Sequence, residues 1–294
     1  FCEFMKITIL GSTGLLGKTL YKEGKKRNLK INGISRKNKK FVFDFRKTKN
    51  LINFLNINKP NIIINAVGIV DIDKCQNNPN LAYKINALPL KFLAEYTKKE
   101  KIKLIQISTD HFFSDKKNMK HSEKSKVKIL NIYAKTKYQA EKFTKINNNH
   151  IIVRTNFTGF KNEGNMKTFI EWVIENSKKK IALFDDYFCS TIDVKSLANF
   201  ILDLLNTNFK GIINIGSSSI SNKKKFAEKF IKKLGIKNIK IEKKSVKTLS
   251  TKRANTLGLK VDLIEKTIKK KMPSINKVIN NLFKEYKNDV CKKI

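Results

Sequence analysis

The chain has 294 residues, long enough to bury a large core in one α/β domain or in a domain with a smaller lobe. It carries 63 Lys and Arg residues against 24 Asp and Glu residues, which gives a formal net charge of +39. No apolar run approaches the ~20 residues that span a bilayer, so no membrane association is expected.

The positive charge comes almost entirely from lysine, which is spread over nearly every expected helix. Sequence-specific nucleic-acid binding usually relies on clustered basic residues and on arginines that hydrogen-bond to base edges. The arginines of this chain stand only at positions 27, 36, 46, 154 and 253. We therefore expect no specific nucleic-acid partner, although the charge favours anionic small molecules such as nucleotides.

The cysteines and histidines show no disulfide framework and no metal site. The cysteines stand at positions 2, 75, 189 and 291 without a C-x-x-C pair, and the histidines at 111, 121 and 150 are not spaced as ligands. Residues 1–4, before Met5, lack the charged and apolar regions of a signal peptide. A cytoplasmic protein with reduced thiols and no bound metal is expected.

Apolar runs alternate with helical patterns along the first half of the chain, which is typical of a doubly wound parallel sheet. The expected strands are residues 6–10, 30–35, 41–43, 61–66, 103–108 and 150–155. The expected helices are residues 15–27, 48–58, 82–99 and 132–145. The sequence therefore predicts a Rossmann-like α/β fold.

The alternation loosens after residue 155. Helices are expected at residues 169–175, 194–205, 223–234, 262–269 and 274–286, with a strand at 211–215. We predict a dinucleotide-binding domain over residues 5–155. Residues 156–294 are predicted to form mainly a smaller, mixed α/β substrate-binding lobe, some segments of which return to the first domain.

Three glycines follow the first expected strand, with two residues between each consecutive pair. Gly11 permits a tight turn, Gly14 lets the backbone approach a pyrophosphate, and Gly17 allows the helix to pack closely on the strand. The helix N-terminus adds free N–H groups and a positive dipole end. Strand, glycines and helix in this order predict dinucleotide binding.

The end of the second strand indicates which dinucleotide is bound. An acid there would hydrogen-bond to a ribose 2′-hydroxyl, whereas a base would accommodate a 2′-phosphate. The strand ends in Ser35 and Arg36 with no acid nearby, and a guanidinium can bind phosphate with two hydrogen bonds. NADPH is the expected cofactor, with NADH as the alternative.

A tyrosine with a lysine four residues later places both side chains on one face of a helix. The ammonium favours the phenolate, so the pair can act as an acid on a carbonyl oxygen. Tyr21, Tyr133 and Tyr138 each have such a lysine, because lysine is abundant in this chain. Only Tyr133, with Lys137, is expected near the carboxyl end of the strand that delivers Ser108 and Thr109, where such sheets bind ligands.

Taken together, these motifs resemble those of the extended short-chain dehydrogenase/reductases, and within them the dTDP-4-dehydrorhamnose reductase family. The resemblance runs from Met5 to about Tyr286. Its matching stretches are residues 11–17, 64–68, 73–74, 86, 108–110, 133–137, 154–155, 185–187, 191 and 253–259.

The resemblance implies an NADPH-dependent reductase of a 4-keto nucleotide sugar that serves polysaccharide precursor synthesis, with a homodimer as the expected assembly. It implies catalytic roles for Thr109, Ser108, Tyr133, Lys137 and Asn86. The implied cofactor-binding residues are Gly11, Thr13, Gly14, Leu15, Leu16, Gly17, Ser35, Arg36, Asp44, Ala66, Val67, Gly68, Tyr133 and Lys137. The implied substrate-binding residues are Arg154, Thr191 and Arg253.

Two alternative functions remain open: a nucleotide-sugar epimerase, and a non-catalytic NADP-binding regulatory subunit of the same fold. Related dehydratases carry Thr-Asp-Glu after the same strand, whereas this chain has Thr109–Asp110–His111, which favours reduction. The chain departs from the family pattern on the substrate side, at residues 69, 111, 134, 157 and 189–190. The identity of the sugar therefore stays open.

Overall fold

The computed structural model describes residues 5–36, 44, 48–114, 119–161, 167–177, 180–237 and 239–290. The chain divides into two compact units, and each unit draws on segments from both sides of residue 155. The first unit comprises Phe1–Thr109, Ile129–Arg154 and Ala198–Ile213. The second unit comprises Asp110–Lys128, Thr155–Leu197 and Asn214–Ile294.

The main sheet has six strands in the order β11-β6-β4-β3-β1-β2. Their bounds are β1 Ile7–Leu10, β2 Ile31–Ile34, β3 Ile62–Asn65, β4 Lys103–Ile107, β6 His150–Thr155 and β11 Gly211–Ile215. The pairings of β1 with β2 and β3, of β3 with β4, and of β4 with β6 are all parallel. Every residue of β1 and β3 is buried, as expected for strands covered by helices on both faces. The predicted Rossmann-like sheet is confirmed.

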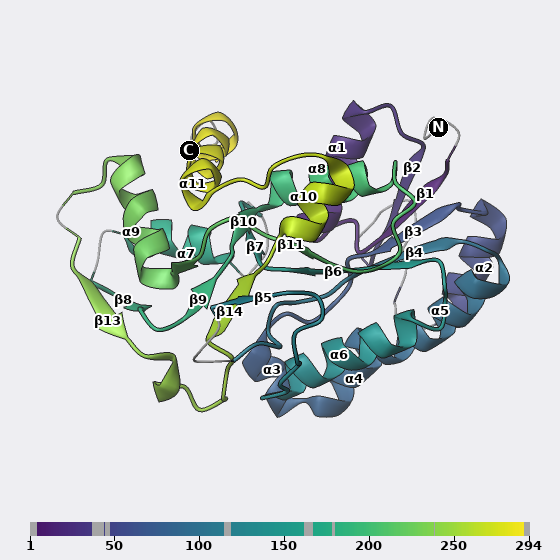
Figure 1. Cartoon of the computed structure of the whole chain (residues 1–294), viewed down its shortest axis with the longest axis horizontal. Helices are drawn as coiled ribbons and strands as arrows, with labels where there is room; N and C mark the ends of the chain where they lie inside the picture. The colour runs from purple at the N-terminus through teal and green to yellow at the C-terminus, as the bar shows by residue number, and fades with distance from the viewer. Residues whose placement is uncertain are drawn as a thin grey trace. The chain divides into compact units, whose positions relative to one another are not determined.

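Helices cover both faces of this sheet. They are α1 Leu15–Lys26, α2 Thr48–Asn58, α3 Ile72–Asn77, α4 Pro79–Asn86, α5 Leu88–Lys99 and α6 Ile132–Thr144, and α8 Val194–Leu204 begins in the second unit and ends in the first. Figure 1 shows α2, α5 and α6 along one side of the sheet and α1 on the other. Leu51, Leu93 and Leu104 belong to the buried apolar cluster that joins α2, α5 and β4. The core of the first unit is thus built from the apolar faces that the sequence pattern predicts.

The prediction of a single helix over residues 82–99 is wrong, because the chain forms two helices there, α4 and α5. Ala87 separates α4 from α5 with φ −120° and ψ −60°, outside helical geometry. Pro89 explains the break, because it lacks an N–H and its ring would clash with the carbonyl of Ile85 in a continuous helix. The sequence pattern also missed α3, whose first turn is capped by the Asp71 carboxylate, which accepts from the Lys74 N–H at 2.9 Å.

The second unit contains short strands that the sequence pattern did not predict. They are β5 Lys120–His121, β7 Phe157–Thr158, β8 Ile181–Phe184, β9 Phe188–Cys189, β10 Ile192–Asp193, β12 Ser221–Asn222, β13 Ile241–Lys244 and β14 Thr256–Leu259. They form a four-stranded sheet in the order β12-β9-β14-β5 and the pairs β10-β7 and β13-β8. Strands of two to four residues carry little readable alternation, so long-range pairing defines them.

The helices of the second unit lie close to their predicted positions. They are α7 Phe169–Asn176, α9 Lys223–Leu234, α10 Asp262–Ile268 and α11 Ile275–Glu285, with a 3₁₀ turn at Val246–Thr248 and a π-helical turn at Tyr286–Val290. The strand expected over residues 41–43 lies outside the described residues. Among the described residues, no helix is both long and apolar enough to cross a membrane.

Candidate active site

The glycine turn after β1 is built as a dinucleotide pyrophosphate would require. Gly11 has φ +84°, a left-handed conformation that favours glycine. A Cβ on Gly17 would lie 2.2 Å from the Gly11 carbonyl oxygen, so the helix can approach the turn this closely only without a side chain at residue 17. The left-handed φ of Gly11 and the close approach at Gly17 agree with the tight turn and the close helix packing that the sequence predicts for these glycines.

The N-terminus of α1 is open to an anion. Gly14 is the N-cap residue in an extended conformation, and no side chain caps the helix. The first turn contains no acidic residue, and Thr13 and Gly14 are exposed. The N–H groups of this turn, together with the positive end of the helix dipole, are therefore suited to bind a phosphate group.

Two serine hydroxyls, those of Ser12 and Ser35, lie after β1 and β2. The buried hydroxyls of Ser12 and Ser35 form no hydrogen bond in the part of the chain that the structure describes. Ser12 packs against Gly33, where an added Cβ would lie 2.5 Å from the Ser12 Cβ. Arg36 follows as an exposed residue, and Asp44 is partly buried. Two unsatisfied hydroxyls, with an arginine directly after Ser35 in the sequence, fit the phosphate-bearing ribose of NADPH.

The residues after β3 line the same sheet edge beside the glycine turn. The Ala66 N–H donates to the Leu10 carbonyl at 3.0 Å, and the Val67 N–H donates to Asn65 Oδ1 at 3.1 Å. A Cβ on Gly11 would lie 3.1 Å from Val67 Cγ2 and 3.2 Å from the Ala66 carbonyl oxygen. The structure thus brings Ala66 and Val67 next to the turn, as expected for residues that border a bound dinucleotide.

Asn86 holds the loop that continues from Gly68. Its Oδ1 accepts from the Ile69 N–H at 2.7 Å, and its Nδ2 donates to the Ile69 carbonyl at 3.1 Å and to Thr136 Oγ1 at 3.3 Å. A Cβ on Gly68 would lie 3.3 Å from Asn86 Oδ1 and 3.9 Å from Lys137 Nζ. Asn86 therefore anchors the loop against α6, close to Lys137.

Tyr133 and Lys137 lie on the first two turns of α6. The helix starts after Asn131, whose side chain caps it by accepting from the Ala134 N–H at 2.9 Å. Tyr133 is 7% exposed and packs in an apolar cluster with Ile72. Lys137 Nζ donates to the Ile107 carbonyl at 2.6 Å, immediately before Ser108 and Thr109. The bond joins the Tyr–Lys helix to the end of β4.

Burial determines the protonation of Lys137. Desolvation lowers the pKa of Lys137 from 10.5 to about 8, while the negative charge of Glu141 opposes this shift. The ammonium form therefore still predominates at neutral pH. A charged lysine one helical turn from a buried tyrosine is the arrangement that increases the acidity of a phenol.

The other two tyrosine–lysine pairs form surface contacts instead. The Lys25 ammonium lies 5.8 Å from the centre of the Tyr21 ring, and Tyr21 is 40% exposed. The Lys142 ammonium lies 5.1 Å from the centre of the Tyr138 ring. Both are cation–π contacts within a helix, and neither lysine is buried as Lys137 is.

Ser108 and Thr109 continue from β4, and their side chains are buried. The Ser108 N–H donates to the Val153 carbonyl at 2.7 Å, so the residue is held between β4 and β6. The Ser108 hydroxyl donates to Glu141 Oε1 at 2.6 Å. Ser108 is therefore already engaged by Glu141 within the protein.

Arg154, expected to contact the substrate, lies in an internal ion pair. It is 2% exposed, and its Nε and Nη2 donate to Glu141 Oε1 and Oε2 at 3.0 and 2.7 Å. These two guanidinium hydrogen bonds go to one buried carboxylate, so the structure places Arg154 in an internal ion pair, and its predicted contact with the substrate stays a prediction. Sequence reasoning missed Glu141, although it follows Lys137 by four residues and is one of the few acids in a lysine-rich chain.

Thr191 and Arg253 belong to the second unit. Thr191 is 2% exposed, and its hydroxyl donates to Asn156 Oδ1 at 2.9 Å. Arg253 is partly buried in the loop before β14. In the same unit, a hydrogen bond of 2.9 Å joins the Tyr187 hydroxyl to His111 Nε2. Thr191 thus has a hydrogen-bond partner within the protein. The positive charge of Arg253 lowers the pKa of His111, which is one of the departures from the family pattern.

His111 is expected to remain neutral between about pH 5 and 8. Burial, reinforced by the positive charges of Arg253 and Lys223, lowers the pKa of His111 from 6.5 to about 3. Between these two values the unfolded chain binds more protons than the folded chain, so this group makes the folded state less stable as the pH falls.

An NMR titration of the imidazole proton checks this expectation. In the folded protein, the His111 signal is expected to stay constant between about pH 5 and 8. In the unfolded chain, the imidazole is expected to titrate near the ordinary histidine pKa of about 6.5. A His111 midpoint above about pH 5 would contradict the burial of this side chain in the folded protein.

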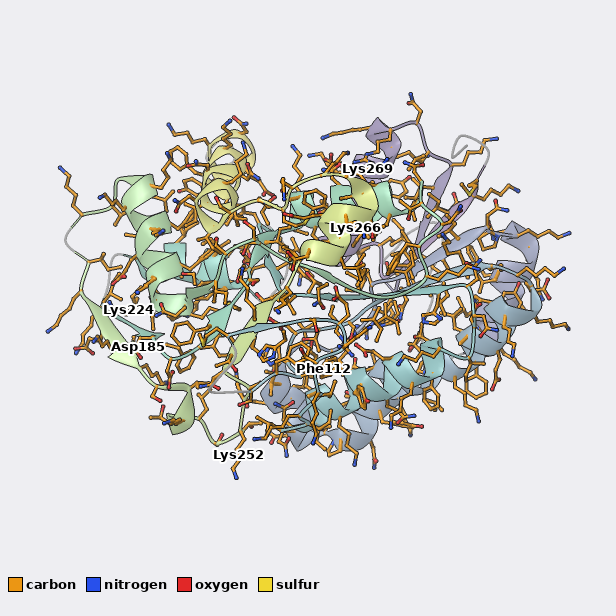
Figure 2. The ribbon with its side chains drawn as sticks, viewed as in Figure 1. Phe112, Asp185, Lys224, Lys252, Lys266 and Lys269 are labelled. Atoms are coloured by element: carbon orange, nitrogen blue, oxygen red, sulfur yellow. The ribbon has the colours of Figure 1, made fainter. Side chains whose placement is uncertain are left out.

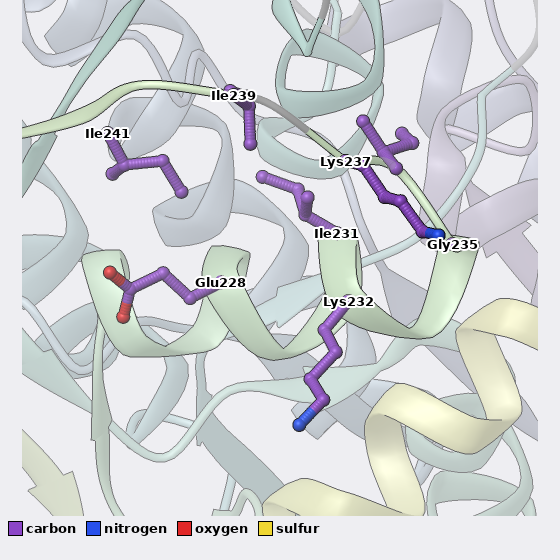
Figure 3. Close-up of a pocket in the computed structure, with 8 residues that line it drawn as sticks. Glu228, Ile231, Lys232, Gly235, Lys237, Ile239 and Ile241 are labelled. Atoms are coloured by element: carbon purple, nitrogen blue, oxygen red, sulfur yellow. The ribbon is translucent and has the colours of Figure 1, made fainter.

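Other features of the described residues do not add to the site. No group of three or more acidic, histidine or cysteine residues is arranged to hold a metal ion in the described ranges. A cavity of about 310 Å³ lies beside α9, and its lining combines isoleucines, including Ile231, Ile239 and Ile241, with charged side chains (Figure 3). Lys224 and Lys266 project from separate helices of the second unit, α9 and α10 (Figure 2).

The fold and the site define a Rossmann-type protein of the short-chain dehydrogenase/reductase class, with a glycine turn and a Tyr–Lys helix at one sheet edge. Comparison with known proteins gives the family. Residues 5–288 match the family described as the RmlD substrate binding domain. The chain therefore belongs to this family.

Individual relatives agree with this assignment. The chain is 25% identical over 202 residues to the dTDP-4-dehydrorhamnose reductase of Salmonella typhimurium, a match that covers 66% of this chain and 65% of that protein. It is 22% identical over 234 residues to the spore coat polysaccharide biosynthesis protein SpsK of Bacillus subtilis, which covers 79% and 80% of the two chains. The first match thus spans just under two thirds of the relative's length.

Solved structures show the same fold. The crystal structure of dTDP-4-dehydrorhamnose reductase from Bacillus anthracis in complex with NADP has a TM-score of 0.87 at 23% identity, covering 96% of this chain and 99% of that chain. UDP-glucose 4-epimerase from Thermotoga maritima with UDP-glucose has a TM-score of 0.83 at 13% identity, covering 96% and 99%. The fold is thus shared by reductases and epimerases.

Proposed function

We propose that the protein is an NADPH-dependent reductase of a 4-keto nucleotide sugar, similar in activity to dTDP-4-dehydrorhamnose reductase, and that it makes a precursor of a polysaccharide. One observation carries this proposal above all others. The Lys137 ammonium, bonded to the Ile107 carbonyl at 2.6 Å, holds the Tyr133 helix against the strand end that presents Thr109. In this proposal, an acid, its activating cation and a hydroxyl donor act together at the sheet edge where such folds bind ligands.

The residues around the glycine turn fit NADPH. The N-terminus of α1 would hold the pyrophosphate over Gly14, while Ser35 and Arg36 would hold the 2′-phosphate. Ala66, Val67 and the other residues after β3 would border the cofactor along the sheet edge. When bound, NADPH supplies the hydride that reduces the ketone carbon.

The chain's own residues supply the proton and stabilise the developing charge. Tyr133 donates its phenolic proton to the ketone oxygen as negative charge grows there. Lys137 favours that transfer because its ammonium stabilises the phenolate left behind. Thr109 donates a second hydrogen bond to the same oxygen. Asn86 keeps the loop at Gly68 in place beside Lys137.

The direct test mixes the protein with NADPH and a panel of 4-keto-6-deoxy nucleotide sugars and follows the absorbance of the reduced nicotinamide. Oxidation of NADPH that depends on one of these sugars is expected, with a 4-hydroxy sugar nucleotide as the product by mass spectrometry. Tight NADPH binding without oxidation by any sugar of the panel would contradict the reductase and favour a regulatory subunit.

Arg36→Ala is expected to remove the preference for NADPH over NADH. Hydrogen bonds to charged groups contribute ~1.5–3 kcal/mol, so NADPH affinity is expected to fall about tenfold or more, while NADH affinity stays unchanged. Titration of both cofactors by nicotinamide fluorescence measures the two affinities.

Arg27→Ala serves as the matched arginine control for Arg36→Ala. Arg27 lies at the C-terminal end of α1, away from the glycine turn, and its Nη1 pairs with Asp203 Oδ1 at 2.8 Å. Removing the Arg27 guanidinium is therefore expected to leave the cofactor preference unchanged. An Arg36→Ala protein with the wild-type preference would contradict the phosphate site.

A further inference from the structure

The face of α6 that carries the reducing site extends one turn further than the Tyr–Lys pair. Tyr133, Lys137 and Glu141 follow one another at intervals of four residues, so they lie along one side of the helix. Glu141 is 1% exposed, and Lys137 is 6% exposed. A buried carboxylate on the active face of this helix calls for a physical explanation, because an uncompensated buried charge is strongly unfavourable.

Both oxygens of Glu141 are engaged. Oε1 accepts from the Ser108 hydroxyl at 2.6 Å and from Arg154 Nε at 3.0 Å. Oε2 accepts from Arg154 Nη2 at 2.7 Å. This two-point guanidinium–carboxylate pair, with 3% and 1% of its side chains exposed, links α6 to β6. The Ser108 bond links the same carboxylate to the end of β4.

The contact with Glu141 gives Ser108 a positioning role. A serine hydroxyl has one proton to donate, and Ser108 donates it to Glu141. It therefore cannot donate to a substrate oxygen while this bond is formed. The bond instead fixes the backbone that leads directly into Thr109.

The carboxylate also acts on Lys137. Both side chains are buried, so their charges interact across a medium that screens them far less than water does. The negative charge of Glu141, with a smaller contribution from Cys75 on α3, favours the protonated form of Lys137 against the effect of desolvation. The Glu141 carboxylate, which Arg154 holds in place, is thus a negative charge one helical turn from Lys137.

We propose that Glu141 and Arg154 are positioning residues of the reducing site: Arg154 anchors Glu141, and Glu141 fixes Ser108 beside Thr109 and keeps Lys137 charged. This inference rests on the proposed function for its catalytic meaning. Neither residue touches the substrate. Their effect reaches the reaction through Lys137 and Thr109.

Glu141→Gln is the informative substitution. Glutamine keeps the shape and an oxygen that accepts from Ser108, but it removes the negative charge. The alkaline limit of NADPH affinity and of kcat/KM, set by deprotonation of Lys137, is expected to move to lower pH by about one unit. Nicotinamide fluorescence gives the affinity from pH 6 to 10, and steady-state rates give kcat/KM over the same range.

Three further variants separate positioning from mere stability. Glu141→Asp keeps the charge and is expected to restore the wild-type alkaline limit. Glu141→Gln combined with Arg154→Met removes both charges, so the fold survives without a buried unpaired guanidinium, and the alkaline limit is expected to remain shifted. Glu23→Gln changes another buried glutamate, paired with Lys26 on α1, and is expected to leave the pH profile unchanged.

The NADPH-affinity measurements on these variants need no sugar. They therefore test the positioning role independently of the proposed reductase activity. If no keto sugar is reduced but the NADPH limit shifts in Glu141→Gln, the proposed function fails and the positioning role stands. If the alkaline limit in Glu141→Gln and in the double variant equals that of the wild type, or if the wild type shows no limit, the positioning role is overturned.

Discussion

Tyr133→Phe is expected to lower kcat by about 10²–10⁴-fold, the usual contribution of a positioned general acid, while NADPH affinity stays at the wild-type level. The substitution removes only the phenolic proton donor and keeps the ring that packs against Ile72 in a buried cluster. Steady-state kinetics with a reducible keto sugar and fluorescence titration of NADPH measure the two quantities.

Tyr138→Phe is a matched control on the same helix. Tyr138 also has a lysine four residues later, and the Lys142 ammonium lies 5.1 Å from the centre of its ring. A phenylalanine ring keeps this cation–π contact, so wild-type kcat is expected. Equal rates in Tyr133→Phe and the wild type would rule out Tyr133 as the acid.

Gly17→Ala is expected to weaken NADPH binding by about tenfold or more. The new Cβ would lie 2.2 Å from the Gly11 carbonyl oxygen and 2.8 Å from its carbon, both of which are backbone atoms. The glycine turn or α1 must therefore move, and overpacking of this kind typically costs ~1–3 kcal/mol. The measurements are NADPH titration and thermal unfolding with and without the cofactor.

Gly24→Ala on the same helix is the control for Gly17→Ala. Its Cβ would lie 2.8 Å from Ile31 Cδ1, the end of a flexible side chain that can turn away. Alanine also favours a helix interior over glycine by ~1 kcal/mol, so NADPH affinity and stability are expected to be retained. Wild-type NADPH affinity in Gly17→Ala would contradict the proposed pyrophosphate site.

Much of the first unit was readable from the sequence because its signals are local. The apolar run Ile7–Leu10, the glycine turn and the amphipathic helix Leu15–Lys26 follow one another within 20 residues. The pairing of Tyr133 with Lys137 depends only on helical spacing. The choice among the three tyrosine–lysine pairs came from their order relative to the expected strands.

The sequence pattern failed for one local reason and one long-range reason. The expected helix over residues 82–99 breaks at Ala87, two residues before Pro89, because the apolar pattern runs through a proline that a continuous helix does not accommodate. The two-residue strands of the second unit exist only through pairing, such as Phe188 with Thr256 and Asn222. Such pairing leaves no periodic trace in the sequence.

By itself, the sequence determined the parallel-sheet class, the dinucleotide turn and the Tyr133–Lys137 pair, because each is encoded by spacing within one or two adjacent elements. Only the tertiary structure decided that Arg154 is an internal residue and that Ser108 is already bonded. Both depend on Glu141, which meets them because β4, β6 and α6 pack together. The partner of a buried charge is determined by which elements become neighbours, and spacing along the chain does not contain that information.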